Sequence, residues 1–348
     1  MLLAACGEGP SDHGATSAPS SPPRENLPEI SAADRDSSLD AIERWLTSGR
    51  ADNATIIART LADRLPGDPH VSLALGRSLI ALGSEWRNDP DRGAQRAREI
   101  SCEAVEILEP AYRRWRAEGI EASEARRSLG LALEGCDRLQ DAIDIYAEAK
   151  ASEDPVSRFH LGLALLRAGQ ASEADIVLLE VGGLRPDDAF VVSARAEAAL
   201  MLGDHSIART LATQAVRLDD GSWPLRVRRA SILRRSGDPT AAVESLLAMD
   251  EEARMELPAL TELTEGWIAL DRPATAAEAW AELASRSSDD PTASIGAAIQ
   301  AAKLFAIAGM DEESITWLEI ARDLDSGDAR ISECERRIEE IRSSRDTS

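Results

Sequence analysis

Short segments with one apolar face follow one another along most of this chain, as the unit around residues 159–186 shows. Apolar residues dominate Phe159–Leu165 and predict a first helix, which ends at the turn Arg167–Gln170. A second helix is predicted by apolar residues at the i, i+3, i+4, i+7 spacing of a buried face: Ala174, Val177, Leu178 and Val181. Pro186 ends the unit, because proline cannot continue a helix. The pattern therefore predicts helix, turn, helix.

This unit recurs with a nearly constant period. A turn glycine followed five residues later by alanine marks it, as in Gly169–Ala174 and Gly203–Ala208, and aspartate replaces the glycine in Asp137–Ala142 and Asp271–Ala276. The alanines of the central run are Ala142, Ala174, Ala208, Ala242 and Ala276, separated by 32, 34, 34 and 34 residues. A single helical hairpin cannot bury its apolar face alone, so a period near 34 predicts a stack of hairpins.

Small residues lie midway along successive first helices. They are Gly130, Gly162, Ala196, Ala230 and Ala302. A missing or minimal side chain at this position lets the paired helix approach closely. We therefore expect a tightly packed core of small helix-forming residues, in keeping with an aromatic content of only 3%.

These residues together resemble the tetratricopeptide repeat (TPR) family. One unit matches at Gly130-Leu131, Ala142, Tyr146, Ala149 and Pro155, and the following units match at Gly162, Gly169, Ala174, Leu178 and Pro186 and at Ala196, Gly203, Ala208, Ala212 and Ala215. The resemblance implies an all-α fold, a right-handed superhelical α-solenoid of about eight helix-turn-helix repeats over residues 39–326. It also implies that first helices line a concave groove. Residues 327–348 are expected to form a capping helix and tail.

The second repeat departs from the pattern. It opens normally with Leu73, Gly76 and Gly83, but residues Ser84–Arg92 then intrude and a long helix is predicted over Gly93–Trp115. We expect a distorted or lengthened repeat there.

The N-terminus Leu3-Ala4-Ala5-Cys6 resembles the lipobox of bacterial lipoproteins, in which the cysteine is lipidated. Residues 1–6 then form a truncated signal-like segment, because only five residues precede Cys6 and a secretion signal needs an apolar run of roughly 7–15. Either the start lies upstream or the match is chance. Gly7 after the cysteine suggests, by the same resemblance, the periplasmic face of the outer membrane rather than the inner membrane. A chance match would leave a cytoplasmic protein.

Composition separates residues 7–38 from the repeats. They are rich in Ser, Pro, Gly, Ala and Asp without periodicity, which predicts a disordered tether.

The whole chain has a net charge of −23, which argues against binding to nucleic acid or to anionic lipid headgroups. Membrane contact is therefore expected only through a lipid anchor on Cys6.

A search for chemistry finds no catalytic or phosphate-binding motif and no metal-ligand spacing, so we expect no enzyme activity, no cofactor and no metal. The cysteines other than Cys6 are Cys102, Cys136 and Cys334. They are far apart and odd in number, so buried free thiols are expected rather than disulfides.

Candidate contacts lie on the first helices, which the family resemblance places along the groove. In the third to fifth complete repeats they are Arg127, Leu131, Phe159, Leu163, Phe190 and Ser193. The basic segment Arg226–Arg235 adds Arg228, Ser231 and Arg235, which share one helical face. Arginine presents forked donors suited to carboxylates, so this face could contact an acidic partner. Alternatively, the arginines pair with acidic residues of adjacent repeats such as Glu197 or Glu262, and the aromatic residues belong to the core.

Two functions are compatible with these patterns. The first is a non-catalytic scaffold, tethered to the membrane, that binds a peptide or protein segment in the groove. The second is an accessory subunit that regulates an envelope enzyme, or a carrier of a small ligand.

Overall fold

Turns separate the chain into helices that pair with their neighbours. The computed structural model describes residues 31–87, 93–118, 122–150, 153–287 and 290–346, and within them it contains eighteen helices and no strand. The predicted all-α class is confirmed. Cys6 and residues 7–30 of the predicted tether lie outside the described residues. The predicted tether extends to Ser38, but the structure places Ala32–Ser38 in the first helix of the array.

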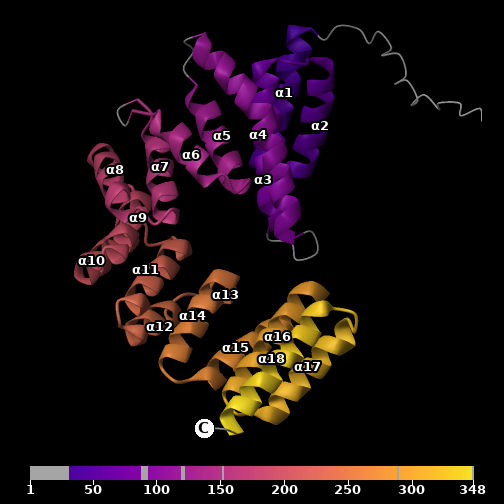
Figure 1. Cartoon of the computed structure of the whole chain (residues 1–348), viewed down its shortest axis with the longest axis vertical. Coiled ribbons are helices and arrows are strands. Elements are labelled where there is room, and N and C mark those ends of the chain that lie inside the picture. The colour runs from indigo at the N-terminus through magenta and orange to yellow at the C-terminus, as the bar shows by residue number, and fades with distance from the viewer. Residues whose placement is uncertain (1–30, 88–92, 119–121, 151–152, 288–289, 347–348) are drawn as a thin grey trace, which may run out of the picture.

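Eight antiparallel pairs form the array, as predicted. They are α1 (Ala32–Thr47) with α2 (Ala51–Arg64), α3 (Pro69–Arg87) with α4 (Gly93–Ala117), α5 (Ser123–Gly135) with α6 (Leu139–Ala147), α7 (Pro155–Arg167) with α8 (Ala171–Leu184), α9 (Ala189–Met201) with α10 (His205–Leu218), α11 (Trp223–Arg235) with α12 (Pro239–Leu247), α14 (Leu257–Ala269) with α15 (Pro273–Arg286), and α16 (Pro291–Ile307) with α17 (Asp311–Leu324). A five-residue helix, α13 (Glu251–Met255), precedes α14, and α18 (Ala329–Asp346) caps the end. Figure 1 shows the solenoid curving from α1–α4 through α8–α10 to α15–α18.

Local sequence explains where these helices begin and end. Asp154 and Asp290 cap α7 and α16 by accepting hydrogen bonds from backbone N–H groups in the first turn. At the other end of α7, Gly169 adopts a φ of +77°, where a side chain is disfavoured, and lets the next N–H return to the carbonyl of Leu165 at 2.9 Å. Asp137 and Asp271 adopt the same left-handed conformation, which confirms that aspartate stands in for glycine at these turns.

The helices of a pair are held by a small residue on the first and a partner sixteen positions later on the second. A Cβ atom added to Gly130 would overlap the ring of Tyr146, and one added to Gly162 would lie 2.5 Å from Leu178. The expected close approach at these glycines is confirmed. Ala230 and Leu246 have the same spacing, and both are fully buried in one hydrophobic core.

The second pair is lengthened, as predicted, but its turn is displaced. Helix α3 continues through Gly83, where the pattern places a turn, and ends at Arg87. A Cβ at Gly83 would lie 3.2 Å from the carbonyl oxygen of Ala97 on α4, so this glycine provides a close helix crossing instead. Gly76 packs against Leu108, thirty-two positions later rather than sixteen, because both helices are extended.

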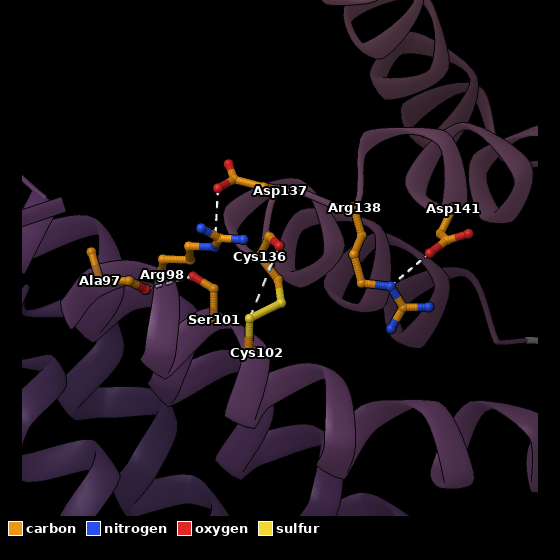
Figure 2. Close-up of a disulfide and its surroundings, with 8 residues drawn as sticks. All are labelled: Ala97, Arg98, Ser101, Cys102, Cys136, Asp137, Arg138 and Asp141. Atoms are coloured by element: carbon orange, nitrogen blue, oxygen red, sulfur yellow. Dashed lines mark hydrogen bonds and ion pairs between the residues drawn. A yellow bond between two sulfur atoms is a disulfide. The ribbon is translucent and has the colours of Figure 1, made fainter. Parts of the chain in front are cut away.

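A disulfide joins Cys102 on α4 to Cys136 at the C-cap of α5, with 4.9 Å between the Cα atoms (Figure 2). The expectation of free thiols was therefore wrong for these two residues. They are 34 residues apart, and the extension of α4 carries Cys102 alongside the end of the next first helix. Cys334 is a buried free thiol, as expected, and burial raises the pKa of its thiol to about 11.

We predict that Gly130→Ala destabilises the fold, because the added methyl overlaps Tyr146 in a fully packed site. The expected loss is about 1–3 kcal/mol in the free energy of unfolding, measured by urea denaturation. Gly183→Ala on α8 is the matched control. A Cβ there meets nothing within 4 Å, so this variant is expected to be neutral or more stable by up to about 1 kcal/mol. Equal losses in both variants would contradict the packing argument.

Candidate functional site

The predicted groove residues lie on four consecutive first helices. Arg127 and Leu131 belong to α5, Phe159 and Leu163 to α7, Phe190 and Ser193 to α9, and Arg228, Ser231 and Arg235 to α11. Each of these helices packs against the next one in the series, so the structure aligns the four side by side. The repeat thus brings first helices from separate segments of the sequence next to one another.

Exposure divides these residues into three groups. Leu131 and Phe190 are 38% and 44% exposed, and Arg228 and Arg235 are also exposed. Four others are partly buried: Arg127, Phe159, Leu163 and Ser231. Ser193 is only 2% exposed, so its hydroxyl is enclosed between neighbouring helices and is not presented to a partner. Ser193 is therefore removed from the candidate site.

Ion pairs account for much of the basic helix. Arg235 donates to Glu197 on α9 at 2.5 Å, and Arg234 donates to both carboxylate oxygens of Glu262 on α14 at 2.5 and 3.2 Å. The alternative interpretation, pairing with acidic residues of adjacent repeats, is thus confirmed for these two arginines. Arg228 forms no ion pair with any residue that the structure describes, and it is the one candidate arginine of α11 left for a partner.

Arg127 takes part in a polar network beneath the surface. The carboxylate of Asp154, 4% exposed, lies 2.8 Å from Arg126 and 3.6 Å from Arg127. Burial alone would raise the pKa of Asp154, but hydrogen bonds from Ser157, Ser123 and Arg126 outweigh it and lower the pKa. This network fixes the start of α7 against α5, so Arg127 has a structural partner as well as a place in the groove.

Phe159 belongs to an aromatic cluster between α6 and α7. The ring of His160 stacks on Tyr146, with 5.5 Å between centroids, and Phe159 lies at 6.0 Å from His160. Burial lowers the pKa of His160, and the positive charge of Arg127 lowers it further. Tyr146 is itself fixed by donating a hydrogen bond to Glu134 at 2.8 Å. Phe159 is therefore supported by core packing while part of its ring stays accessible.

Concave features of the surface lie both at one candidate residue and away from the candidate helices. Phe190 lines a depression between the α8–α9 and α10–α11 connections, together with Arg185, Asp188 and Leu218. A second cavity, between α13, α14, α15 and α16, was missed by the sequence analysis. The sequence carries a small signal for it, because the turns at Asp271 and Gly309 are 38 residues apart rather than 34.

Among the described residues, no group of three or more His, Cys, Asp or Glu side chains is arranged to hold a metal ion. None of the described helices combines the length and the apolar character needed to cross a bilayer. The candidate residues that are accessible offer apolar contact through Leu131 and Phe190 and a positive charge through Arg228.

Comparison with known proteins identifies the fold. No family model and no curated protein matches the chain. Yeast Tom70 is similar in structure, with a TM-score of 0.54 and 17% identity over 92% of this chain and 66% of Tom70. A tetratricopeptide repeat protein from Parabacteroides merdae gives a TM-score of 0.49 and 13% identity over 76% of this chain and 98% of that one. The chain thus has a TPR-like fold. At such identities the likeness shows the fold alone.

We predict that His160 makes the fold sensitive to mild acid. The pKa of His160 is lower in the folded chain than in the unfolded chain, where a histidine has a pKa near 6.5. The unfolded chain therefore binds the proton more readily than the folded chain, and the free energy of unfolding falls as pH drops below about 6.5. In urea denaturation at pH 7 and pH 5, His160→Phe is expected to lose less stability than the parent chain. His205→Phe, at an exposed position on α10, is the control and should not differ from the parent. An unchanged pH response in His160→Phe would contradict the assignment.

Proposed function

We propose that this protein is a non-catalytic scaffold that binds a peptide or protein segment along its first helices. The observation that carries the proposal is the series of neighbouring first helices α5, α7, α9 and α11, on which Leu131, Phe190 and Arg228 are exposed. Apolar side chains left exposed on a rigid array suit an amphipathic or extended partner. Net charge −23 disfavours nucleic acid as that partner.

Energetics favour apolar anchors over the arginines as the source of affinity. Truncating a well-buried interface residue costs on the order of 2 kcal/mol or more, whereas an exposed ion pair contributes about 0–1 kcal/mol. Arg235 is already paired with Glu197. Leu131 and Phe190 are therefore assigned the main contacts, and Arg228 contributes to selectivity.

The proposal is tested by quantitative capture on the immobilised full chain from a bacterial envelope extract, with mass spectrometry as the readout. We predict that the double variant Leu131→Glu, Phe190→Glu retains at least about 10-fold less of the partner, because two apolar contacts are replaced by charge. Ile176→Glu, at an apolar residue of α8 that is 61% exposed, is the matched control and should capture as the parent does. Equal losses in both variants, or no enriched protein, would contradict a site on the first helices.

We further propose that the protein resides in the bacterial cell envelope, anchored by a lipid on Cys6. The Cys102–Cys136 disulfide supports this location, because disulfides persist in oxidising compartments and are rare in a reducing cytosol. The lipobox-like Leu3-Ala4-Ala5-Cys6 points the same way.

We predict that thiol trapping of acid-quenched cells leaves Cys102 and Cys136 unlabelled, whereas the denatured chain labels at Cys334. Cys6→Ser is expected to move the protein from the membrane fraction to the soluble fraction without changing that labelling pattern. Reduced Cys102 and Cys136 in cells would overturn the assigned compartment, and an unchanged membrane fraction would overturn the anchor.

A further inference from the structure

The array is interrupted between α14 and α16. First helices of successive repeats pack against each other from α1 to α3, α5, α7, α9, α11 and α14, and again from α16 to α18. Helices α14 and α16 lack such extensive contact, and α15 packs more extensively on α16 than on its own partner α14. Figure 1 shows α15–α18 grouped together, apart from α13 and α14. Cavities form at such discontinuities between packed units.

A cavity of about 660 Å³ occupies this interruption. Its walls include Met255, Leu257, Trp280 and Leu283, and the small residues Gly296 and Ala297 of α16 leave the space open. This volume lies within the range of roughly 300–1,000 Å³ that is typical of ligand sites. Leu257 is 59% exposed, so an apolar side chain stands at the cavity without a core partner.

The walls are held in place by packing and hydrogen bonds. The indole N–H of Trp280 donates to Thr264 Oγ1 at 2.7 Å, which fixes the ring between α14 and α15. Helix α13 is anchored by Met249 and Ala253, which are 6% and 8% exposed in the same core. The cavity is therefore preformed, so an occupant loses little affinity to rearrangement of the protein.

Charge at the rim is unbalanced. Arg286 is paired with Glu251 and with Glu282, and Arg330 is paired with Asp328. Glu252 and Glu256 also line the cavity and form no ion pair with any residue that the structure describes. The cations at the rim are thus already neutralised, whereas two carboxylates stay available to a positively charged group.

We propose that this cavity binds a partner segment in which an apolar side chain lies next to a lysine or arginine. The apolar side chain would pack against Leu257 and Trp280, and the basic group would pair with Glu252 and Glu256. The apolar contact supplies most of the affinity, while the exposed carboxylates select for positive charge and speed association. This inference rests on the proposed scaffold function and adds a second contact outside the α5–α11 surface.

Selection from a library of random 12-residue peptides displayed on phage tests the proposal, with the full chain as bait.

The cavity itself is tested with the variant Gly296→Phe, which fills it from α16. A Cβ at this position makes only an ordinary contact, 3.8 Å from Arg330 Nη1, so the helix can hold a side chain there. Gly183→Phe is the matched control, because a Cβ on that part of α8 meets nothing within 4 Å. Circular dichroism and thermal melting establish that both variants are folded.

The charge is tested separately with Glu252→Gln, Glu256→Gln, a double substitution at exposed positions that needs no space in the core. Glu244→Gln, exposed on α12, is its control. This pair keeps the proposal testable should Gly296→Phe fail to fold. Selected peptides are synthesised, and their affinities are measured by fluorescence anisotropy at two salt concentrations.

The expected result is a set of peptides that carry an apolar residue next to Lys or Arg. They should bind the parent and Gly183→Phe equally, bind Gly296→Phe at least tenfold more weakly, and bind the double Gln variant severalfold more weakly. Their affinity should fall as salt rises.

Other outcomes overturn the proposal in distinguishable ways. Peptides that bind Gly296→Phe normally but are lost in Leu131→Glu, Phe190→Glu leave the scaffold function standing and remove the cavity from it. Peptides lost in Gly296→Phe that lack basic residues overturn the assigned ligand class. An absence of enriched peptides overturns the cavity proposal, and combined with an absence of captured protein in the envelope experiment it overturns the scaffold function as well.

Discussion

The architecture depends on one packing constraint, the close approach of a second helix to a small residue midway along a first helix. Gly130 with Tyr146 and Gly162 with Leu178 show why the constraint is strict: the larger partner occupies the volume that a Cβ atom would need. Every other level of order follows from it. Close helical pairs present regular faces, regular faces stack with a constant step, and the stack aligns side chains from distant parts of the sequence into one surface.

Periodicity made this level predictable from sequence. A spacing of 34 residues and an i, i+3, i+4, i+7 pattern depend only on local geometry, so the helical pairs, the left-handed aspartates and the close glycine contacts followed directly. The sequence could not predict that helix α3 continues through Gly83. A glycine permits either a turn or a close helix crossing, and the neighbouring helix decides between them. The disulfide depended on the resulting extension of α4.

The candidate site was predictable only in part. The repeat pattern predicted that the candidate residues lie on first helices, and they do. Their exposure depends on the packing of successive repeats, which encloses Ser193 and leaves Phe190 accessible. The cavity between α14 and α16 left only a small trace in the sequence. The glycine or aspartate turns are 34 residues apart from Gly237 to Asp271, but 38 residues apart from Asp271 to Gly309, the interval that spans the cavity.

That interruption also bears on how the molecule folds. In a linear array, cooperativity is carried by the interfaces between neighbouring units, and a sparse interface divides the array into regions that open independently. Helices α15, α16 and α18 share one hydrophobic core with α11–α14, but α15 meets α14 through a smaller contact than it makes with α16. We expect local opening of the C-terminal four helices to begin at this smaller contact, and amide hydrogen exchange would register it as weaker protection on the α14–α15 side than within α15–α16.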